Sequence, residues 1–252
     1  MSGRLSVVGL GPGPAAWMTP EASERIAEAS DVVGYAPYVA RLGLRGDQRT
    51  HASDNREELA RARFALALAE DGANVAVVSG GDPGVFAMAA AVFEAAEERA
   101  AWRAVDISVA PGVSAMQAAA ARLGAPLGHD FCAISLSDNL KPWAAVERRL
   151  RAAAEGDFVI ALYNPASKAR PSRIGEAFAL LAAMKAHATP VAFARAVGRA
   201  DERLTLTTLG EADVAIVDMA TLVIVGSSET RMIAREGAPP WMLTPRSYGG
   251  SR

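Results

Sequence analysis

Short apolar runs alternate with segments of helical spacing through the first half of the chain. Apolar runs that end at glycine, proline or polar residues predict buried strands. Such runs lie at residues 5–10, 31–33, 75–78 and 105–110. Between them, apolar residues recur with the spacing of one helix face. This alternation of strand and helix predicts a parallel sheet with helical crossovers.

The polar positions predict where these helices begin and end. Thr19 before Pro20 is typical of a capped helix start. The quartet DNRE at residues 54–57 resembles a capping box, and Gly72 predicts the end of the helix that it opens. Asp82 also precedes a proline, and it is interpreted as the N-cap of the next helix.

The pattern changes after the glycine- and proline-containing segment at residues 124–128. Strands are predicted at residues 131–136, 158–163, 191–194, 203–207 and 221–225, with helices at 144–154 and 173–186. Residues 198–202 predict a hairpin turn between two of these strands. Strands that follow one another without a helix favour antiparallel pairing, so we expect a mixed sheet.

These patterns predict a two-domain α/β protein. Residues 1–124 form an N-terminal α/β domain with glycine-rich loops and a parallel sheet, and residues 125–252 form a C-terminal α/β domain with a mixed sheet. The tail at residues 241–252 is predicted to be irregular but packed, because it contains Trp241, Met242 and Tyr248.

Composition then narrows the classes of function. Of the 252 residues, 51% are hydrophobic and 21% charged, which is typical of a globular protein. The formal net charge of −2 gives no sign of a nucleic-acid surface. Cys132 is the only cysteine and the three histidines are scattered, so we expect no intrachain disulfide and no metal site. No apolar run approaches the ~20 residues of a membrane helix, and no leader pattern precedes the first strand; we expect a cytoplasmic protein.

Two glycine-rich loops follow predicted strands, but neither has the pattern of a phosphate-binding loop. The first, GLGPGP at residues 9–14, lacks the third glycine of the dinucleotide fingerprint, and its prolines remove backbone N–H donors. The second, SGGDP at residues 79–83, follows the carboxyl end of a strand, where α/β proteins bind ligands. Its glycines allow a flat ligand to approach the backbone closely.

Three loops in this order, GLGPG at residues 9–13, SGGDP at 79–83 and PGVSA at 111–115, resemble the motifs of the tetrapyrrole methylases. These enzymes use S-adenosylmethionine (SAM) to build cobalamin and sirohaem. Four further stretches most resemble the members that methylate carbon 17 of precorrin-3B and contract the macrocycle to precorrin-4: GYAPY at 34–38, SLSDNL at 135–140, YNPASKARP at 163–171 and GSSET at 226–230. The resemblance spans nearly the whole chain. It implies two α/β domains with SAM bound between them, usually in a homodimer, and a small-molecule tetrapyrrole as substrate.

The resemblance also implies roles for individual residues. Residues around the glycine loops are expected to hold SAM, together with two from the C-terminal domain: Pro12, Gly80, Gly81, Asp82, Val85, Phe86, Ser114, Ala115, Leu136 and Asn164. Ring contraction requires a base, and we also expect an acid. The sequence leaves several candidates for these catalytic groups open, namely Asp138, Ser137 and His129.

The substrate of such an enzyme carries many carboxylates, so its site needs cations. A basic cluster follows the strand predicted at residues 158–163, and one lysine follows the Ser-Asp-Asn stretch. The expected substrate-binding residues are Tyr35, Asn139, Lys141, Lys168, Arg170 and Arg173.

Two other functions remain open at this stage. The chain could be another tetrapyrrole methylase, acting on precorrin-4 or on a cobalt-containing precorrin. It could also be a non-catalytic tetrapyrrole carrier that keeps the fold without the methyl donor. The sequence does not distinguish a metal-free substrate from a cobalt-containing one.

Overall fold

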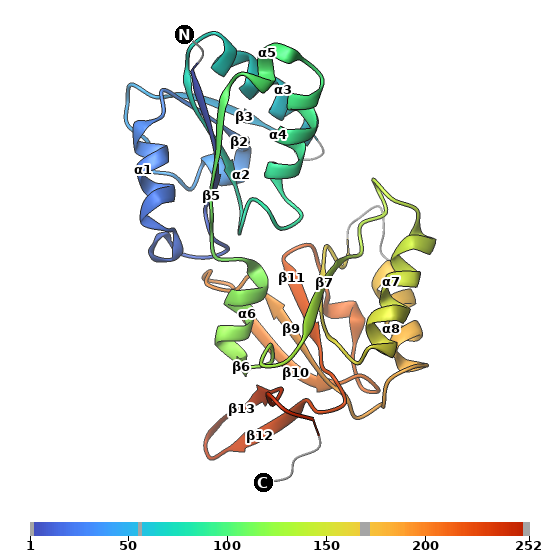
Figure 1. The fold of residues 1–252 in the computed structure, drawn as a ribbon. Helices are drawn as coiled ribbons and strands as arrows, with labels where there is room; N and C mark the ends of the chain where they lie inside the picture. Colours follow the sequence, from blue (N-terminus) through green and yellow to red (C-terminus); the bar gives the residue numbers. More distant parts are fainter. Residues whose placement is uncertain (1–2, 55–56, 167–171, 249–252) are drawn as a thin grey trace. The chain divides into compact units, whose positions relative to one another are not determined.

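Figure 1 shows a computed structural model of the chain, which describes residues 3–54, 57–166 and 172–248. The chain forms two compact units, Met1–Ala115 and Met116–Arg252. Each unit has its own sheet and its own hydrophobic core. The sequence places the boundary at Gly124, where a predicted helix ends, whereas the units divide where that helix begins.

The first unit is built on a five-stranded sheet in which every neighbouring pair is parallel. The order is β3-β2-β4-β1-β5, with β1 (Arg4–Gly9), β2 (Asp31–Tyr35), β3 (Arg49–Ser53), β4 (Asn74–Ser79) and β5 (Asp106–Ala110). The predicted parallel sheet is therefore confirmed. Strand β3 has no apolar run, because it is an exposed edge strand of sequence RTHAS, and the apolar pattern does not predict it.

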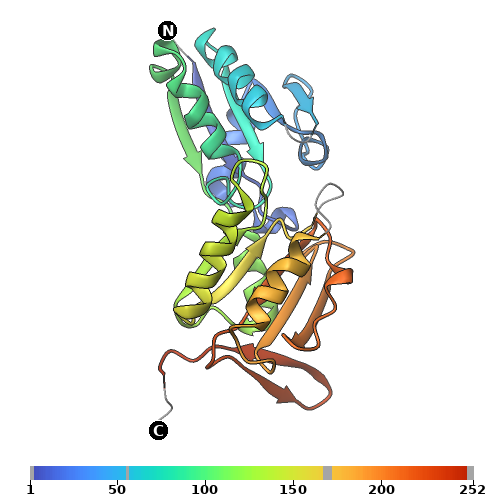
Figure 2. The same ribbon diagram turned by 90° about the vertical axis from the view of Figure 1, so that its right-hand side faces the viewer.

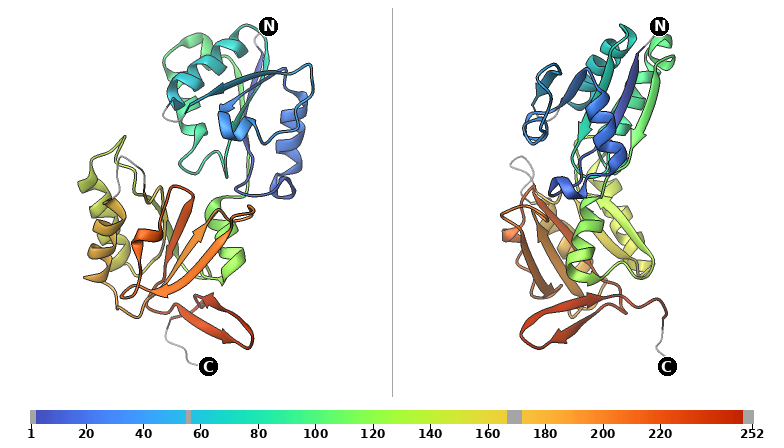
Figure 3. Two further views of the ribbon diagram at one scale, coloured as in Figure 1. Left: turned by 180° about the vertical axis from the view of Figure 1, so that it is seen from behind. Right: turned by 90° about the vertical axis from the view of Figure 1, so that its left-hand side faces the viewer.

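Helices cover both faces of this sheet (Figure 3). They are η1 (Ala15–Trp17), α1 (Pro20–Glu28), α2 (Ala36–Val39), α3 (Glu58–Glu70), α4 (Met88–Glu97) and α5 (Ala100–Arg103). Successive strand residues point to opposite faces. Val75 and Val77 pack with α3, α4 and α5, whereas Ala76 and Val78 pack with α1 and α2. The apolar runs therefore bury both faces, as parallel sheets require.

The observed helix ends can be compared with those predicted from the polar residues. Thr19 is the N-cap of α1, and its Oγ1 accepts a hydrogen bond from the backbone N–H of Ala22 at 3.2 Å, as predicted. Gly72 follows the end of α3 with a φ of 96°, which is also confirmed. The predicted capping box is wrong: α3 begins at Glu58, and Asp54 instead presents its carbonyl oxygen to Arg61. Two residues of the DNRE quartet, 55 and 56, lie outside the described residues.

The second unit contains a mixed five-stranded sheet in the order β10-β9-β11-β8-β7. Its strands are β7 (Phe131–Ser135), β8 (Val159–Tyr163), β9 (Pro190–Arg195), β10 (Arg203–Thr208) and β11 (Thr221–Val225). Among the described strands of this sheet, β7 and β8 alone pair in parallel, and the turn at residues 198–202 joins the antiparallel pair β9–β10. The predicted mixed sheet and hairpin are confirmed.

The helices of the second unit are α6 (Ala115–Leu123, beginning at the last residue of the first unit), α7 (Trp143–Glu155), α8 (Arg173–Ala182) and the short η2 (Val214–Ile216). Helices α7 and α8 lie side by side (Figure 2) and bury Leu150 and Leu181 against the sheet. Within the described ranges, no helix combines the length and the apolar character needed to cross a bilayer.

The predicted irregular tail is partly wrong. Strands β12 (Arg231–Arg235) and β13 (Ala238–Leu243) form a hairpin, and β13 also pairs with the two-residue strand β6 (Gly124–Ala125). Met242 is fully buried, so its expected packing is confirmed, whereas Trp241, opposite Ile233 in the hairpin, and Tyr248 remain about half exposed. Because β13 contains Pro239 and Pro240, the sequence pattern does not predict this strand. They precede the residues of β13 that pair with β6, near an irregularity in the hairpin register, where proline is tolerated.

Asp157 joins the start of β8 to the end of β11 and to the tail. Its Oδ1 accepts hydrogen bonds from the backbone N–H of Ser228 at 2.8 Å and from Lys185 Nζ at 3.2 Å. Its Oδ2 accepts from Ser228 Oγ at 2.6 Å and from the Tyr248 hydroxyl at 2.8 Å. Burial alone would raise the pKa of Asp157, but the hydrogen bonds from Ser228, Tyr248 and Lys185 together lower it. The ionised carboxylate therefore stabilises this end of the second unit.

We expect Asp157→Asn to lower the free energy of unfolding by about 1–3 kcal/mol near neutral pH. The pKa of Asp157 is lower in the folded chain than in the unfolded one. Its stabilisation is therefore complete above the unfolded value of about 3.9 and is lost as the pH falls through the lower folded value. Urea unfolding of both proteins between about pH 7 and about pH 3 measures this.

Asp130→Asn is the matched control, because the Asp130 side chain is 83% exposed. It should leave the stability unchanged across the series. An Asp157→Asn protein as stable as the parent near neutral pH, or a stability difference that does not shrink in acid, would contradict the assignment.

Candidate functional site

The loops after β1, β4 and β5 meet at one edge of the first unit's sheet. The parallel register pairs Gly9 with Ser79 and Val8 with Ala110, so the chain leaves these three strands at the same level. The carboxyl edge of a parallel sheet is where α/β proteins bind ligands. The three loops singled out in the sequence are therefore neighbours in space.

Glycine backbones form the contacts between these loops. Gly11 and Gly81 exchange two backbone hydrogen bonds, each with an N···O distance of 3.1 Å. A Cβ atom on Gly112 would lie 2.4 Å from the carbonyl oxygen of Gly81, and one on Gly9 would lie 2.7 Å from the nitrogen of Gly112. Any side chain at positions 9 or 112 would push the loops apart.

Asp82 is not a helix cap, and that interpretation of the sequence is wrong. Helix α4 begins only at Met88, after an intervening turn. The Asp82 carboxylate instead bridges two loops: Oδ1 accepts from the N–H of Gly84 at 2.8 Å, and Oδ2 accepts from the N–H of Gly112 at 3.0 Å. An Asp-Pro pair looks the same in the sequence whether the aspartate caps a helix or bridges two loops. The two roles differ only because residues 111–115 lie beside this turn in the fold.

The same edge carries apolar groups suited to a ligand. Phe86 has a φ of 52° and is 50% exposed, and an exposed aromatic residue with strained backbone is typical of a binding loop. Val85 and Pro12 are half-buried in the neighbouring loops. Ser114 is buried, and Ala115 begins α6. The structure therefore brings together every residue of the first unit that the sequence assigns to the cofactor.

Tyr35, predicted to bind substrate, lies at the end of β2 on this same edge. Its ring contacts that of Tyr38 edge to face, with centroids 5.3 Å apart. Tyr38 packs on Gly80 so closely that a Cβ there would lie 2.6 Å from its ring carbon Cζ. The sequence reasoning did not assign Tyr38 a role. Its signal is the second aromatic residue of the GYAPY stretch.

In the second unit, the predicted residues Leu136 and Asn164 follow the parallel strands β7 and β8. The N–H of Leu136 donates to the carbonyl oxygen of Tyr163 at 2.9 Å, and the Leu136 side chain is fully buried. Leu136 as a whole is therefore enclosed at the end of β7. Asn164 has a φ of 50°, and its Nδ2 lies 3.0 Å from Ser135 Oγ, which fixes its side-chain amide at the carboxyl ends of β7 and β8.

Tyr163 is a further residue without a role in the sequence analysis. Its hydroxyl accepts a hydrogen bond from the N–H of Met116 at 3.1 Å, in the first turn of α6. The first N–H groups of a helix have no partner within the helix, so an acceptor here stabilises the helix start. The only sequence signal is the tyrosine that opens the YNPASKARP stretch.

Arg173 is engaged by acidic side chains. Its Nε and Nη2 donate to Asp138 Oδ2 at 2.9 and 2.8 Å, and its Nη1 donates to Glu176 Oε2 at 2.8 Å. The guanidinium also stacks on Trp143, 4.6 Å from the ring centroid. Arg173 therefore fixes the position of Asp138 after β7. Its positive charge, which was predicted to bind a substrate carboxylate, is already balanced by the carboxylates of Asp138 and Glu176.

The remaining predicted substrate residues are less closely placed. Asn139 is exposed and Lys141 is half-buried, and both lie between Asp138 and α7. Lys168 and Arg170 lie outside the described residues.

The three catalytic candidates do not lie together. Ser137 and Asp138 follow the carboxyl end of β7, whereas His129 precedes its amino end. The His129 ring contacts Tyr248 with centroids 4.8 Å apart, and its Nδ1 is 3.9 Å from Asp130 Oδ2. The structure thus separates His129 from the other two, at opposite ends of one strand.

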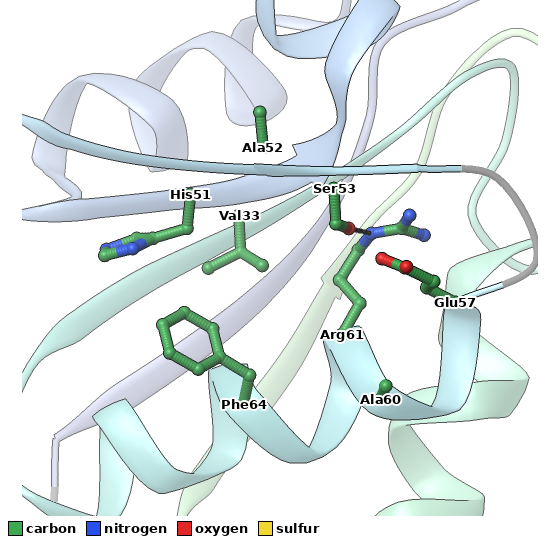
Figure 4. Close-up of a pocket in the computed structure, with 8 residues that line it drawn as sticks. All are labelled: Val33, His51, Ala52, Ser53, Glu57, Ala60, Arg61 and Phe64. Carbon is green, nitrogen blue, oxygen red and sulfur yellow. Dashed lines mark hydrogen bonds between the residues drawn. The ribbon is translucent and has the colours of Figure 1, made fainter.

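A pocket of about 380 Å³ lies elsewhere in the first unit, between β3 and α3 (Figure 4). Arg61 lines it, 5% exposed, with its Nε donating to Ser53 Oγ at 2.9 Å. His51 and Phe64 face each other with ring centroids 5.0 Å apart. The residues that line this pocket include none of those predicted from the sequence. Among the described residues, no cluster of three histidine, cysteine, aspartate or glutamate side chains could hold a metal.

A parallel α/β unit with a glycine-lined ligand edge, followed by a mixed α/β unit, defines the class of protein. The family model described as tetrapyrrole (corrin/porphyrin) methylases matches residues 4–213. The chain belongs to the tetrapyrrole methylases, as the three loops indicate.

Known relatives match over the whole chain. A precorrin-3B C(17)-methyltransferase of Sinorhizobium sp is 60% identical over 252 residues, covering 100% of this chain and 99% of that protein. A probable cobalt-factor III C(17)-methyltransferase of Salmonella typhimurium is 45% identical, covering 97% of this chain and 99% of that protein. The crystal structure of the methyltransferase CobJ matches with a TM-score of 0.93 and 48% identity, covering 97% of this chain and 100% of that one.

We expect Asp82→Ala to loosen the contact between the two loops without disturbing α4. The amide hydrogens of Gly84 and Gly112 should exchange with solvent about 5–30-fold faster, because each loses a charge-assisted acceptor. Hydrogen exchange followed by NMR measures this. The amide of Val77 in β4 is the internal control. Faster exchange in the first turn of α4, with Gly112 unchanged, would restore the cap interpretation.

Proposed function

We propose that this protein transfers the methyl group of SAM to carbon 17 of precorrin-3B and promotes contraction of the macrocycle to precorrin-4, in cobalamin biosynthesis. The observation that carries the proposal is the likeness to the Sinorhizobium methyltransferase, at 60% identity over 100% of this chain and 99% of that protein.

The proposed SAM site in the first unit is built largely from the backbone of glycine loops. A Cβ on Gly81 would meet only the nitrogen of Ala115 at 3.9 Å and the carbonyl oxygen of Val113 at 4.0 Å. The Cα of Gly81 therefore faces a space bounded by residues 113–115, where a flat group can approach without meeting a side chain. The groups proposed to hold SAM are Pro12, Gly80, Gly81, Asp82, Val85, Phe86, Ser114 and Ala115, with Leu136 and Asn164 from the second unit as the family resemblance implies.

Asp82 contributes to the proposed SAM site mainly by fixing the backbone of the loops around it. Both of its carboxylate oxygens already accept N–H groups, so its contribution is to hold residues 80–84 and 112 in a fixed geometry. When bound, SAM supplies an electrophilic methyl group, which carbon 17 accepts as the sulfur–carbon bond breaks with its electron pair passing to sulfur. Such a displacement depends on orientation and exclusion of water more than on a strong acid or base. Fixed loops meet that requirement.

Ring contraction requires removal of a proton from the hydroxyl at carbon 20. We propose Ser137 and Asp138 as the groups to test first. They lie at the carboxyl edge of the second unit's parallel pair, beside Asn164 and Ser135, whereas His129 lies at the opposite end of β7. For substrate carboxylates we propose Tyr35, Asn139, Lys141, Lys168, Arg170 and Arg173, with Arg173 acting mainly on Asp138.

The reaction itself is the direct test. The protein is incubated with precorrin-3B and SAM carrying a carbon-13 methyl group. We expect one added methyl group by mass spectrometry, its NMR signal at carbon 17, and precorrin-4 as product. A reaction without SAM is the control. Absence of methylated product, or a methyl group at another carbon, would refute the proposal.

A cobalt-containing substrate is a second candidate, favoured by the Salmonella relative named for cobalt-factor III at 45% identity. Parallel measurements of kcat/KM with precorrin-3B and with cobalt-factor III decide between them. A higher value for cobalt-factor III would replace precorrin-3B as the substrate while leaving the methylated position unchanged. A carrier without a methyl donor would instead show no saturable heat with S-adenosylhomocysteine in calorimetry.

We also propose that the enzyme works in the cytoplasm as a homodimer, as the family resemblance implies. Sedimentation equilibrium of the purified chain, whose monomer mass is 26.2 kDa, measures the assembly directly. A monomer at micromolar concentration would contradict the dimer, and fractionation of cell extracts tests the location.

We expect Gly81→Ala to weaken S-adenosylhomocysteine binding about tenfold or more, because the new methyl group fills the proposed SAM site. Gly81 has a φ of 70°, so the substitution also adds backbone strain of about 1–2 kcal/mol. Gly237→Ala is the matched control: Gly237 has a φ of 65°, and a Cβ there meets nothing within 4 Å. Both variants should lose similar stability, and only Gly81→Ala should lose affinity. Equal affinities in calorimetry would remove Gly81 from the cofactor site.

A further inference from the structure

The peptide group that joins Pro111 to Gly112 is held at both ends by side chains from other loops. Its carbonyl oxygen accepts a hydrogen bond from Thr19 Oγ1 at 3.1 Å. Its N–H donates to Asp82 Oδ2 at 3.0 Å. A peptide group is planar, so one donor and one acceptor at its two ends fix the direction in which the chain continues toward Ser114 and Ala115.

The Thr19 hydroxyl therefore has two partners. As N-cap of α1 it accepts the N–H of Ala22 at 3.2 Å, and with its own proton it bonds the Pro111 carbonyl. Capping requires only the acceptor. The contact with Pro111 requires the proton.

Residues 111–114 depend on such side-chain contacts. Strand β5 is the edge of the sheet and pairs only with β1, so the chain leaves it with one neighbouring strand. Pro111 has no N–H to donate. On the other side, Gly112 packs against the carbonyl oxygen of Gly81 without room for a Cβ. A rotation of the Pro111–Gly112 peptide would therefore change both the Gly81 contact and the position of Ser114.

We propose that Thr19 is a positioning residue for the methyl-donor site: its hydroxyl proton, acting on the Pro111 carbonyl, holds residues 111–115 in the conformation that binds SAM. The inference rests on the proposed function, because it takes the ligand of this edge to be SAM. Thr19 itself acts through the loop and is not a catalytic residue.

The isosteric pair Thr19→Asp and Thr19→Asn separates the two roles of the hydroxyl. Asp and Asn are both good N-caps, but only Asn carries a donor for the Pro111 carbonyl. An ionised Asp would also place negative charge against that carbonyl oxygen. Thr19→Ser keeps both functions and is the conservative reference. Ser23→Asp is the charge control: it adds the same charge in the first turn of the same helix, at an exposed residue whose hydroxyl bonds the Thr19 carbonyl and not that of Pro111.

Calorimetry with S-adenosylhomocysteine, steady-state kinetics with SAM and thermal unfolding are measured for the parent and all four variants. We expect Thr19→Asp to bind about three- to tenfold more weakly than Thr19→Asn, with a matching rise in KM for SAM and little change in kcat. The Ser and Asn variants and Ser23→Asp should bind like the parent. Melting temperatures should stay close to that of the parent, because the cap is kept.

Equal affinities of the Asp and Asn variants would overturn the inference, whatever their stabilities. A loss of affinity in Ser23→Asp equal to that in Thr19→Asp would overturn it as well, because charge alone would then explain the effect. Failure of the parent protein to bind S-adenosylhomocysteine would instead refute the proposed function, and the two failures are therefore distinct.

Discussion

Backbone contact between glycine loops is the constraint on which the ligand edge of the first unit depends. The parallel register brings the ends of β1, β4 and β5 to one level, but ordinary side chains would keep the following loops apart. Gly9, Gly11, Gly81 and Gly112 remove that obstacle, so two loops pair through their backbones and a third packs against them. The polar and aromatic side chains of this edge lie around the contact between the glycine loops.

The parts of the fold that could be predicted from the sequence are those in which local pattern and tertiary environment agree. Strands β1 and β4 are apolar because both faces of their sheet are buried, and a continuous apolar run signals this. Strand β3 is polar because it lies at the edge, and β13 contains Pro239 and Pro240 beside a register irregularity. Strand β3 pairs with β2, and β13 pairs with β12 and with the distant β6. The local hydrophobic pattern does not show these pairings.

The candidate site divides in the same way. The resemblance of three loops to the family's motifs predicted which loops act together, and the parallel register brings those loops to one edge of the sheet. The motifs could not predict charge balance: Arg173 is predicted from the sequence to bind a substrate carboxylate, but in the structure its charge is balanced by Asp138 and Glu176. The separation of His129 from Asp138, in contrast, follows from the strand predicted at residues 131–136, because the two residues flank it. Pairings between side chains are decided by the fold, and only the fold shows them.

Thr19 and Asp82 show how one local signal can have different tertiary results. Each precedes a proline and predicts a helix start, and the prediction is right for Thr19 and wrong for Asp82. Yet both side chains bind the same peptide group, one as donor to the Pro111 carbonyl and the other as acceptor of the Gly112 N–H. A short side chain with a polar oxygen, placed just before a proline, can cap a helix, bind a neighbouring loop or do both. Which of these it does depends on whether another loop comes within hydrogen-bonding distance, and here the glycines at positions 9, 81 and 112 allow one to do so.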